Sequence, residues 1–152
     1  FYEVDKKFKV SNGPAIDEKN KLIFFSDSFN RVIYQYDLNN LNKKIFYKFT
    51  KNEGFPDGLA IDSQKGLWVA HWGGSRISRI KYSGKLDFNY FLPAKNITSL
   101  AFFGKNLNYI FVTTAKIGIK KSLLYKYKYS GSAFIIKTNF KGLKIPYAQI
   151  KI

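Results

Sequence analysis

The chain has 152 residues, the length of one domain of ordinary size. Lys and Arg number 26 against 10 Asp and Glu, so the formal net charge is +16 with the one histidine neutral. Hydrophobic residues make up 45% of the chain and aromatic residues 18%, a composition that excludes intrinsic disorder. The chain contains no cysteine, which excludes disulfide frameworks, thiol nucleophiles and cysteine-bound zinc or iron–sulfur centres.

The apolar runs of the chain are short. None approaches the roughly 18 residues that a membrane-spanning helix needs, so we expect no membrane partner. The chain starts at Phe1 and contains no methionine, which predicts that further sequence precedes it in the intact protein. No leader peptide can be recognised, and the sequence leaves the cellular compartment open.

Three segments of the chain resemble one another, at residues 11–37, 56–82 and 98–127. Each contains short runs rich in Val, Ile, Phe and Tyr, separated by the turn residues Asn, Asp, Gly and Ser, a pattern typical of β-strands. A further run of the same kind closes each unit, at residues 45–49, 86–91 and 133–138. The repeat therefore contains four strands.

Four strands that recur about every 40 to 45 residues are typical of a β-propeller, in which each repeat forms one radial blade. No stretch shows the 3.6-residue period of a helix. We therefore predict an all-β chain, a partial propeller of about three four-stranded antiparallel blades with repeats at residues 8–50, 54–92 and 96–140 and a tail at 141–152. The innermost strands are expected near residues 13–16, 58–61 and 99–103, with four buried side chains on the blade strands: Leu67, Trp68, Val69 and Phe102.

Three blades form an open arc, because propeller rings typically contain about four to eight. An open arc leaves sheet faces and edges uncovered. We expect either blades that precede Phe1 or a second chain to close the ring.

Several strings of the sequence carry a family resemblance: residues 11–13 (SNG), 54–62 (GFPDGLAID), 66–77 (GLWVAHWGGSRI), 98–102 (TSLAF) and 112–115 (VTTA). Together they resemble the regucalcin/gluconolactonase family, also called senescence-marker-protein-like, with a weaker echo at residues 142–148. The resemblance implies a six-bladed propeller, of which this chain would be the C-terminal half. It also implies one divalent cation at the mouth of the central channel and hydrolysis of a sugar lactone.

The resemblance assigns roles to two residues. It implies that Asn12 and Asp57 are metal ligands and that Asp57 is also the general base, taking a proton from the attacking water while the metal polarises the lactone carbonyl. The Glu and the second Asn of the family's ligand set are absent from this chain. Calcium is the expected cation, with zinc, magnesium or manganese as alternatives.

The repeats lead to the same two residues by another route. Asn12 and Asp57 each precede a glycine and an innermost strand, so rotation about a propeller axis aims both at one centre, where oxygen ligands suit a hard cation such as calcium. Asn-Gly and Asp-Gly are also ordinary turn dipeptides, which is the structural alternative. Ser99 holds the third equivalent position and is expected to contact substrate or a bound water. His71, which follows an apolar strand, is a weaker candidate for contact with substrate or for moving a proton, and structural or mouth-lining use is its alternative.

Other polar residues have simpler interpretations. Four aspartates recur at strand ends and are expected to form turns by accepting backbone N–H groups: Asp17, Asp27, Asp37 and Asp62. A noncatalytic binding or structural propeller module is the main alternative to a lactonase.

A basic surface for nucleic acid is a third hypothesis, which the sequence disfavours. Only three of the basic residues are arginines, and the lysines are dispersed, which predicts no single basic stripe. The alternation of Lys and Tyr at residues 126–128 is expected to give a strand with one solvated and one buried face.

Overall fold

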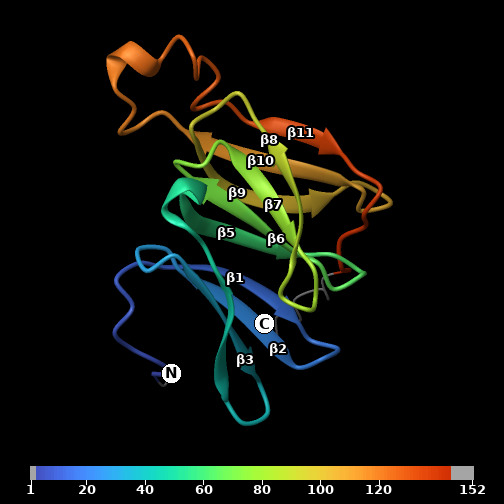
Figure 1. Cartoon of the computed structure of the whole chain (residues 1–152). Coiled ribbons are helices and arrows are strands. Elements are labelled where there is room, and N and C mark those ends of the chain that lie inside the picture. The colour runs from blue at the N-terminus through green and yellow to red at the C-terminus, as the bar shows by residue number, and fades with distance from the viewer. Residues whose placement is uncertain (1–2, 145–152) are drawn as a thin grey trace, which may run out of the picture.

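The computed structural model describes residues 3–144 and contains three antiparallel sheets stacked side by side (Figure 1). The first sheet is formed by β1 (Ser11–Asp17), β2 (Leu22–Asp27), β3 (Val32–Asp37) and β4 (Lys43–Lys48). The second is formed by β5 (Phe55–Ile61), β6 (Leu67–Trp72), β7 (Arg76–Ile80) and β8 (Leu86–Phe91). The third is formed by β9 (Asn96–Phe103), β10 (Tyr109–Ala115) and β11 (Phe134–Lys137).

Helical structure within residues 3–144 is limited to two 3₁₀ turns, η1 (Lys51–Glu53) and η2 (Lys121–Leu123). None of the helices in this part of the chain is long and apolar enough to cross a bilayer. The expected all-β class is therefore confirmed.

The strands of each sheet pair in sequence order, which is how the strands of a propeller blade are connected. The first strands of the three sheets, β1, β5 and β9, are neighbours in space, because β5 packs against both of the others. They include the residues expected for the innermost strands. The sheets are thus arranged as consecutive blades around one side of an axis.

The core consists of two apolar clusters, one at each boundary between sheets. Leu67 and Val69 on β6 belong to the cluster shared with the first sheet, whereas Trp68 belongs to the cluster shared with the third. Since side chains alternate along a strand, the middle blade is buried on both faces. The expected burial of these three residues is confirmed. Phe102 is only half-buried, because it lies at the margin of the second cluster with its ring edge-on to Trp68 at 5.7 Å.

The third sheet corrects one expectation, because it has three strands among the described residues and residues 122–127 are not one of them. This segment forms local turns, in which the amide of Leu124 donates to Lys121 O and the amide of Tyr127 donates to Leu123 O. The outer edge of β10, where the expected strand would pair, is occupied by β11. Since the edge of β10 is occupied, the segment satisfies backbone groups through these local bonds.

The strand-end aspartates form turns as expected. Each accepts a backbone N–H from a residue two to four positions further on: Asn20 to Asp17, Asn30 to Asp27, Asn39 to Asp37, and Gln64 and Gly66 to Asp62. Asp62 additionally forms a buried ion pair with Arg79, a contact that no sequence motif indicates.

Candidate functional site

The three inner strands share an irregularity near their first residues. The pairing register shifts just after Asn12 on β1, across Asp57 on β5 and just before Ser99 on β9. A β-bulge turns a side chain away from the regular alternation of the sheet and is common beside active sites. All three predicted positions therefore lie at the same end of adjacent inner strands, where the backbone departs from regular pairing.

Asn12 is held by a short chain of hydrogen bonds. Its Nδ2 donates to Ser28 Oγ at 2.9 Å, and the Ser28 hydroxyl donates to Pro56 O at 2.5 Å. Because the Ser28 proton is given to Pro56, Ser28 Oγ must accept from Asn12, which fixes the orientation of the amide. The Asn12 Oδ1 accepts no hydrogen bond from the described residues, so this oxygen is available to a ligand.

Asp57 follows Pro56 directly, so the same hydrogen bonds connect it to Asn12 across the two sheets. Its backbone O accepts a further bond from Ser26 Oγ at 3.3 Å, and its side chain is half-buried. Within residues 3–144 the carboxylate has no ion pair or hydrogen bond, and burial raises its pKa to about 6. A carboxylate with this pKa suits proton abstraction near neutral pH and would also be stabilised by a cation.

Ser99 lies against Gly58, the residue that follows Asp57. A Cβ placed at Gly58 would stand 2.6 Å from Ser99 Oγ and 2.7 Å from Ser99 Cα. The absence of a side chain at position 58 thus allows β5 and β9 to approach closely beside Asp57. The structure brings together Asn12, Asp57 and Ser99.

His71 lies in the packed interior between the first two sheets. It is fully buried, its ring stands edge-on to Phe49 at 5.1 Å, and its Nδ1 donates to Glu53 O at 2.7 Å. Burial lowers its pKa to about 4, so the ring is neutral at pH 7. These contacts favour the structural alternative for His71 over contact with substrate.

The donor set fits a hard divalent cation in chemistry. An amide oxygen and a carboxylate are the ligands that calcium prefers, but calcium takes about six to eight oxygens. Residues 3–144 contain no cluster of three or more His, Cys, Asp or Glu side chains that could complete the set. Asn12 and Asp57 can therefore form part of a cation site.

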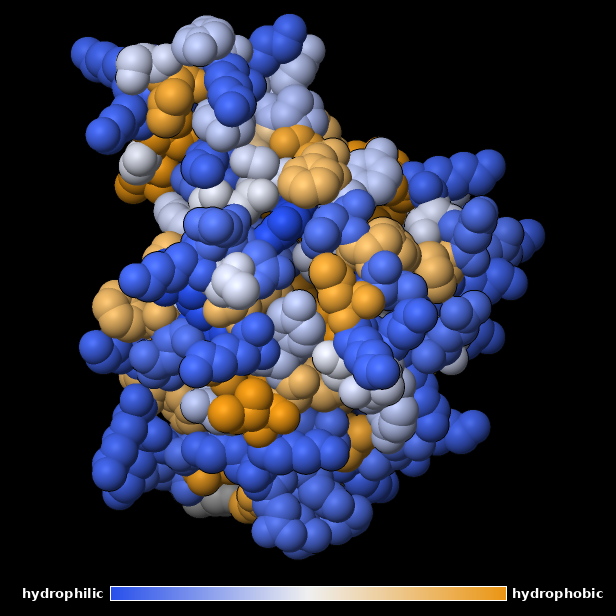
Figure 2. All heavy atoms as spheres, viewed as in Figure 1, coloured by the Kyte–Doolittle hydropathy of each residue, from blue (hydrophilic) through white to orange (hydrophobic). Residues whose placement is uncertain are grey.

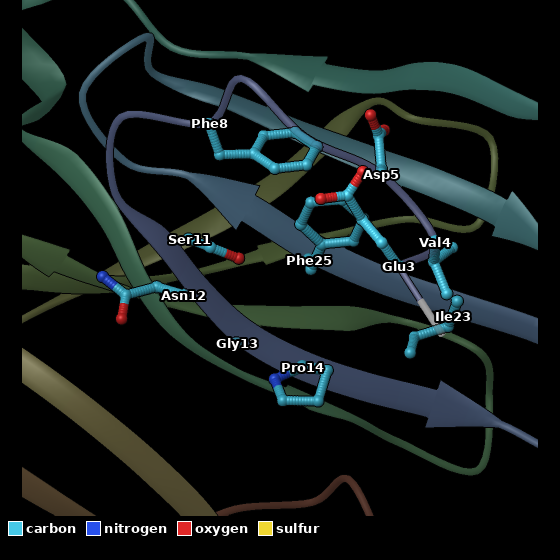
Figure 3. A pocket seen from close by; sticks show the side chains of 10 residues that line it. All are labelled: Glu3, Val4, Asp5, Phe8, Ser11, Asn12, Gly13, Pro14, Ile23 and Phe25. Atoms are coloured by element: carbon cyan, nitrogen blue, oxygen red, sulfur yellow. The ribbon is translucent and has the colours of Figure 1, made fainter. Parts of the chain in front are cut away.

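A separate pocket of about 540 Å³ lies between the N-terminal segment and the first two strands (Figure 3). Asn12, Gly13 and Pro14 line one side of it, and Asp5 lies on the opposite side from the Asn12 amide. The Asp5 carboxylate is already occupied by the Tyr36 hydroxyl and by Lys43 Nζ. Asp57 does not line this pocket, so we do not place the candidate site there.

The serines that support the site had no signal in the sequence. Ser26 and Ser28 flank a turn aspartate and belong to no motif, and their role appears only when the first and second sheets meet.

Sheets of this topology, with the first strands of adjacent sheets side by side, are typical of β-propeller proteins. Residues 2–116 match the family model described as the SMP-30/Gluconolactonase/LRE-like region. The chain belongs to this family.

Individual relatives extend the match over most of the chain. It is 31% identical to a protein named putative sugar lactone lactonase YvrE from Bacillus subtilis, over 96% of this chain and 52% of the relative. It is 34% identical to regucalcin from Danio rerio, over 91% of this chain and 49% of the relative. The chain thus spans about half the length of the curated relatives it matches.

Solved structures show the same fold. The structure of regucalcin from Agrobacterium tumefaciens, described as a calcium-binding protein, superposes with a TM-score of 0.85 at 21% identity, over 93% of this chain and 50% of that one. A luciferin-regenerating enzyme superposes with a TM-score of 0.75 at 30% identity, over 88% and 47%. The partial propeller expected from the repeats is therefore confirmed.

Proposed function

We propose that this chain supplies part of the active site of a divalent-metal-dependent sugar lactone hydrolase of the gluconolactonase type. The observation that carries the proposal is the placement of Asn12 and Asp57 on neighbouring inner strands, joined through Ser28, with the pKa of Asp57 raised to about 6. The name of the Bacillus subtilis relative supports the choice of a lactone as substrate.

In this mechanism Asp57 is the general base. It takes a proton from a water molecule, whose oxygen forms a bond to the lactone carbonyl carbon. The ring C–O bond then breaks, and the proton passes to the leaving alkoxide, so that lactone and water give a hydroxy acid. Ser99, which lies against Gly58 beside Asp57, would donate a hydrogen bond from its hydroxyl to the substrate.

Asn12 and Asp57 would hold the cation through their oxygens. A bound divalent cation would polarise the carbonyl and stabilise negative charge on its oxygen. Calcium is the first choice because both donors are hard oxygens, with zinc, magnesium and manganese as alternatives.

We further propose that other blades complete the ligand set, either from a longer protein or from a second chain. Two protein ligands leave most positions of a calcium ion to water, and such a site binds weakly. We therefore expect the 152-residue chain alone to bind calcium or zinc poorly and to hydrolyse gluconolactone no faster than buffer.

The test is a gluconolactone hydrolysis assay with added calcium or zinc, run on the 152-residue chain and on a chimera completed with the remaining blades of the Bacillus subtilis relative. Metal-dependent turnover by the chimera alone supports the proposal. Turnover by the short chain would show that the site is placed wrongly. A folded chimera that binds no cation and has no turnover would support a noncatalytic propeller module instead.

A further inference from the structure

The acidic residues of the chain end at Asp87. Residues 88–152 contain no Asp, Glu or Arg and eleven lysines: Lys95, Lys105, Lys116, Lys120, Lys121, Lys126, Lys128, Lys137, Lys141, Lys144 and Lys151. In the structure, residues 96–137 form the third sheet and its loops. Residues 1–87 have a net charge of +5 and residues 88–152 a net charge of +11, so the net positive charge is concentrated in the C-terminal part of the chain, much of which forms the third sheet.

Five of these lysines lie in one loop, residues 116–132, which we call the basic turn segment. It connects β10 to β11 and projects from the third sheet, at the upper left of Figure 1. All five lysines are exposed, and none forms an ion pair with any residue between 3 and 144. Figure 2 shows hydrophilic and hydrophobic residues next to one another on this projection.

Aromatic rings are interleaved with these lysines. Tyr125 is 80% exposed and Tyr129 is 43% exposed. Lys128 Nζ lies 4.8 Å from the centre of the Tyr129 ring, and Lys126 Nζ lies 5.6 Å from that of Tyr127. In a strand, one of these two residue types would face the core. Because the segment folds as turns, side chains of both types are exposed.

We propose that the basic turn segment binds single-stranded nucleic acid without sequence preference. Lysines neutralise backbone phosphates and release counterions, and an exposed aromatic ring gives a base a surface on which to stack. Residues 88–152 contain no acidic side chain that would repel phosphate. We favour nucleic acid over an anionic lipid surface because the most exposed ring of the segment, Tyr125, directly precedes the exposed Lys126, so that a base can stack beside a neutralised phosphate. The proposal is independent of the lactonase proposal, since it uses none of the same residues.

The test is fluorescence anisotropy of a labelled 15-nucleotide oligothymidylate with the 152-residue chain, between 50 and 150 mM KCl. Each lysine that contacts a phosphate should contribute about −0.7 to the slope of log affinity against log salt. Replacing Lys120, Lys121, Lys126 and Lys128 by Gln should therefore weaken binding at least about tenfold at 50 mM KCl and flatten the slope by about 2 to 3. The matched control replaces four exposed lysines of the first two sheets and their connections, Lys19, Lys44, Lys48 and Lys51, by Gln, and should lose less than about threefold.

A tyrosine variant separates stacking from charge. Tyr125→Ala should weaken binding about fivefold or more without changing the salt slope, whereas Tyr82→Ala, on the second blade, should have no effect. Equal losses in the two four-lysine variants would mean that only net charge matters and would overturn the proposal. The proposal would also be overturned if Tyr125→Ala bound the oligonucleotide as tightly as the parent chain does. Binding of the chain to phosphatidylserine vesicles in place of the oligonucleotide would overturn it too. Circular dichroism of each variant confirms that it is folded.

Discussion

Arg79 on β7 and Asp62 at the end of β5 form a buried, two-point ion pair. Arg79 Nε donates to Asp62 Oδ2 at 2.7 Å and Nη2 donates to Asp62 Oδ1 at 3.2 Å. The same carboxylate accepts Trp68 Nε1 at 2.7 Å. A Cβ at Gly66 would lie only 2.3 Å from the guanidinium, so the glycine makes room for the pair. The pair therefore ties three strands of the middle blade together.

Arg79→Ala should lower the free energy of unfolding by about 3 to 5 kcal/mol, because it leaves the Asp62 carboxylate buried without its partner. Urea denaturation followed by circular dichroism measures the loss. Lys81→Ala is the control: Lys81 is 56% exposed and lies 3.3 Å from Asp87, so its removal should cost about 1 kcal/mol or less. Equal losses in the two variants would show that the buried pair adds nothing beyond a surface pair.

Ser28→Ala should destabilise the chain by about 1 to 3 kcal/mol, because it leaves Pro56 O and Asn12 Nδ2 without their partner. Ser83→Ala, at an exposed turn, should change stability by less than about 0.5 kcal/mol. Both variants are compared by urea denaturation. If Ser28→Ala were as stable as Ser83→Ala, the hydrogen bonds of Ser28 between the first two blades would contribute nothing to stability.

The raised pKa of Asp57 predicts a pH dependence. The folded chain keeps a proton on Asp57 up to about pH 6, whereas the unfolded chain releases it near the ordinary value of 3.8. The folded state therefore binds more protons in this window, and stability should fall as the pH rises from about 4 to 6. Asp57→Asn should remove this fall. Unfolding free energies of parent and variant across pH 4 to 7 make the comparison, and identical curves would contradict it.

Asp5 should show the opposite dependence. Hydrogen bonds from Lys43 and Tyr36 lower its pKa to about 2, so its contribution is present above pH 4 and is lost as the pH falls toward 2. Asp5→Asn should therefore be less stable than the parent at pH 7, with a smaller further loss between pH 4 and 2. Thermal unfolding of the parent and the variant, followed from pH 7 down to pH 2, measures both the loss at pH 7 and the further loss in acid. A variant that matches the parent at pH 7 would show that these hydrogen bonds do not hold the N-terminal segment to β3 and β4.

In the completed lactonase, Asp57→Asn should lower kcat at least about 100-fold, because it removes the base and a charged ligand together. Asn12→Ala should instead raise the cation concentration needed for half-maximal activity and leave kcat at saturating cation much less affected. Steady-state rates over a calcium titration separate the two effects. Full activity of Asp57→Asn would remove Asp57 from the mechanism.

The sequence by itself determined the strands of the first two sheets and their order. Alternating apolar residues and turn-forming aspartates such as Asp17 and Asp27 are local signals, and local signals are readable because neighbours in the chain are also neighbours in the structure. The repeat then placed Asn12, Asp57 and Ser99 at equivalent positions. Their closeness followed from one assumption, that the repeats form consecutive blades.

The tertiary structure alone decided which partner each side chain and each edge obtained. Residues 122–127 have a strand-like composition, but β11 occupies the edge of β10, so they form turns and expose Tyr125. Ser28 joins Asn12 to Pro56, and Arg79 pairs with Asp62, only because separate strands meet. Such contacts depend on the distance between residues far apart in the chain, and a local sequence pattern carries no information about that distance.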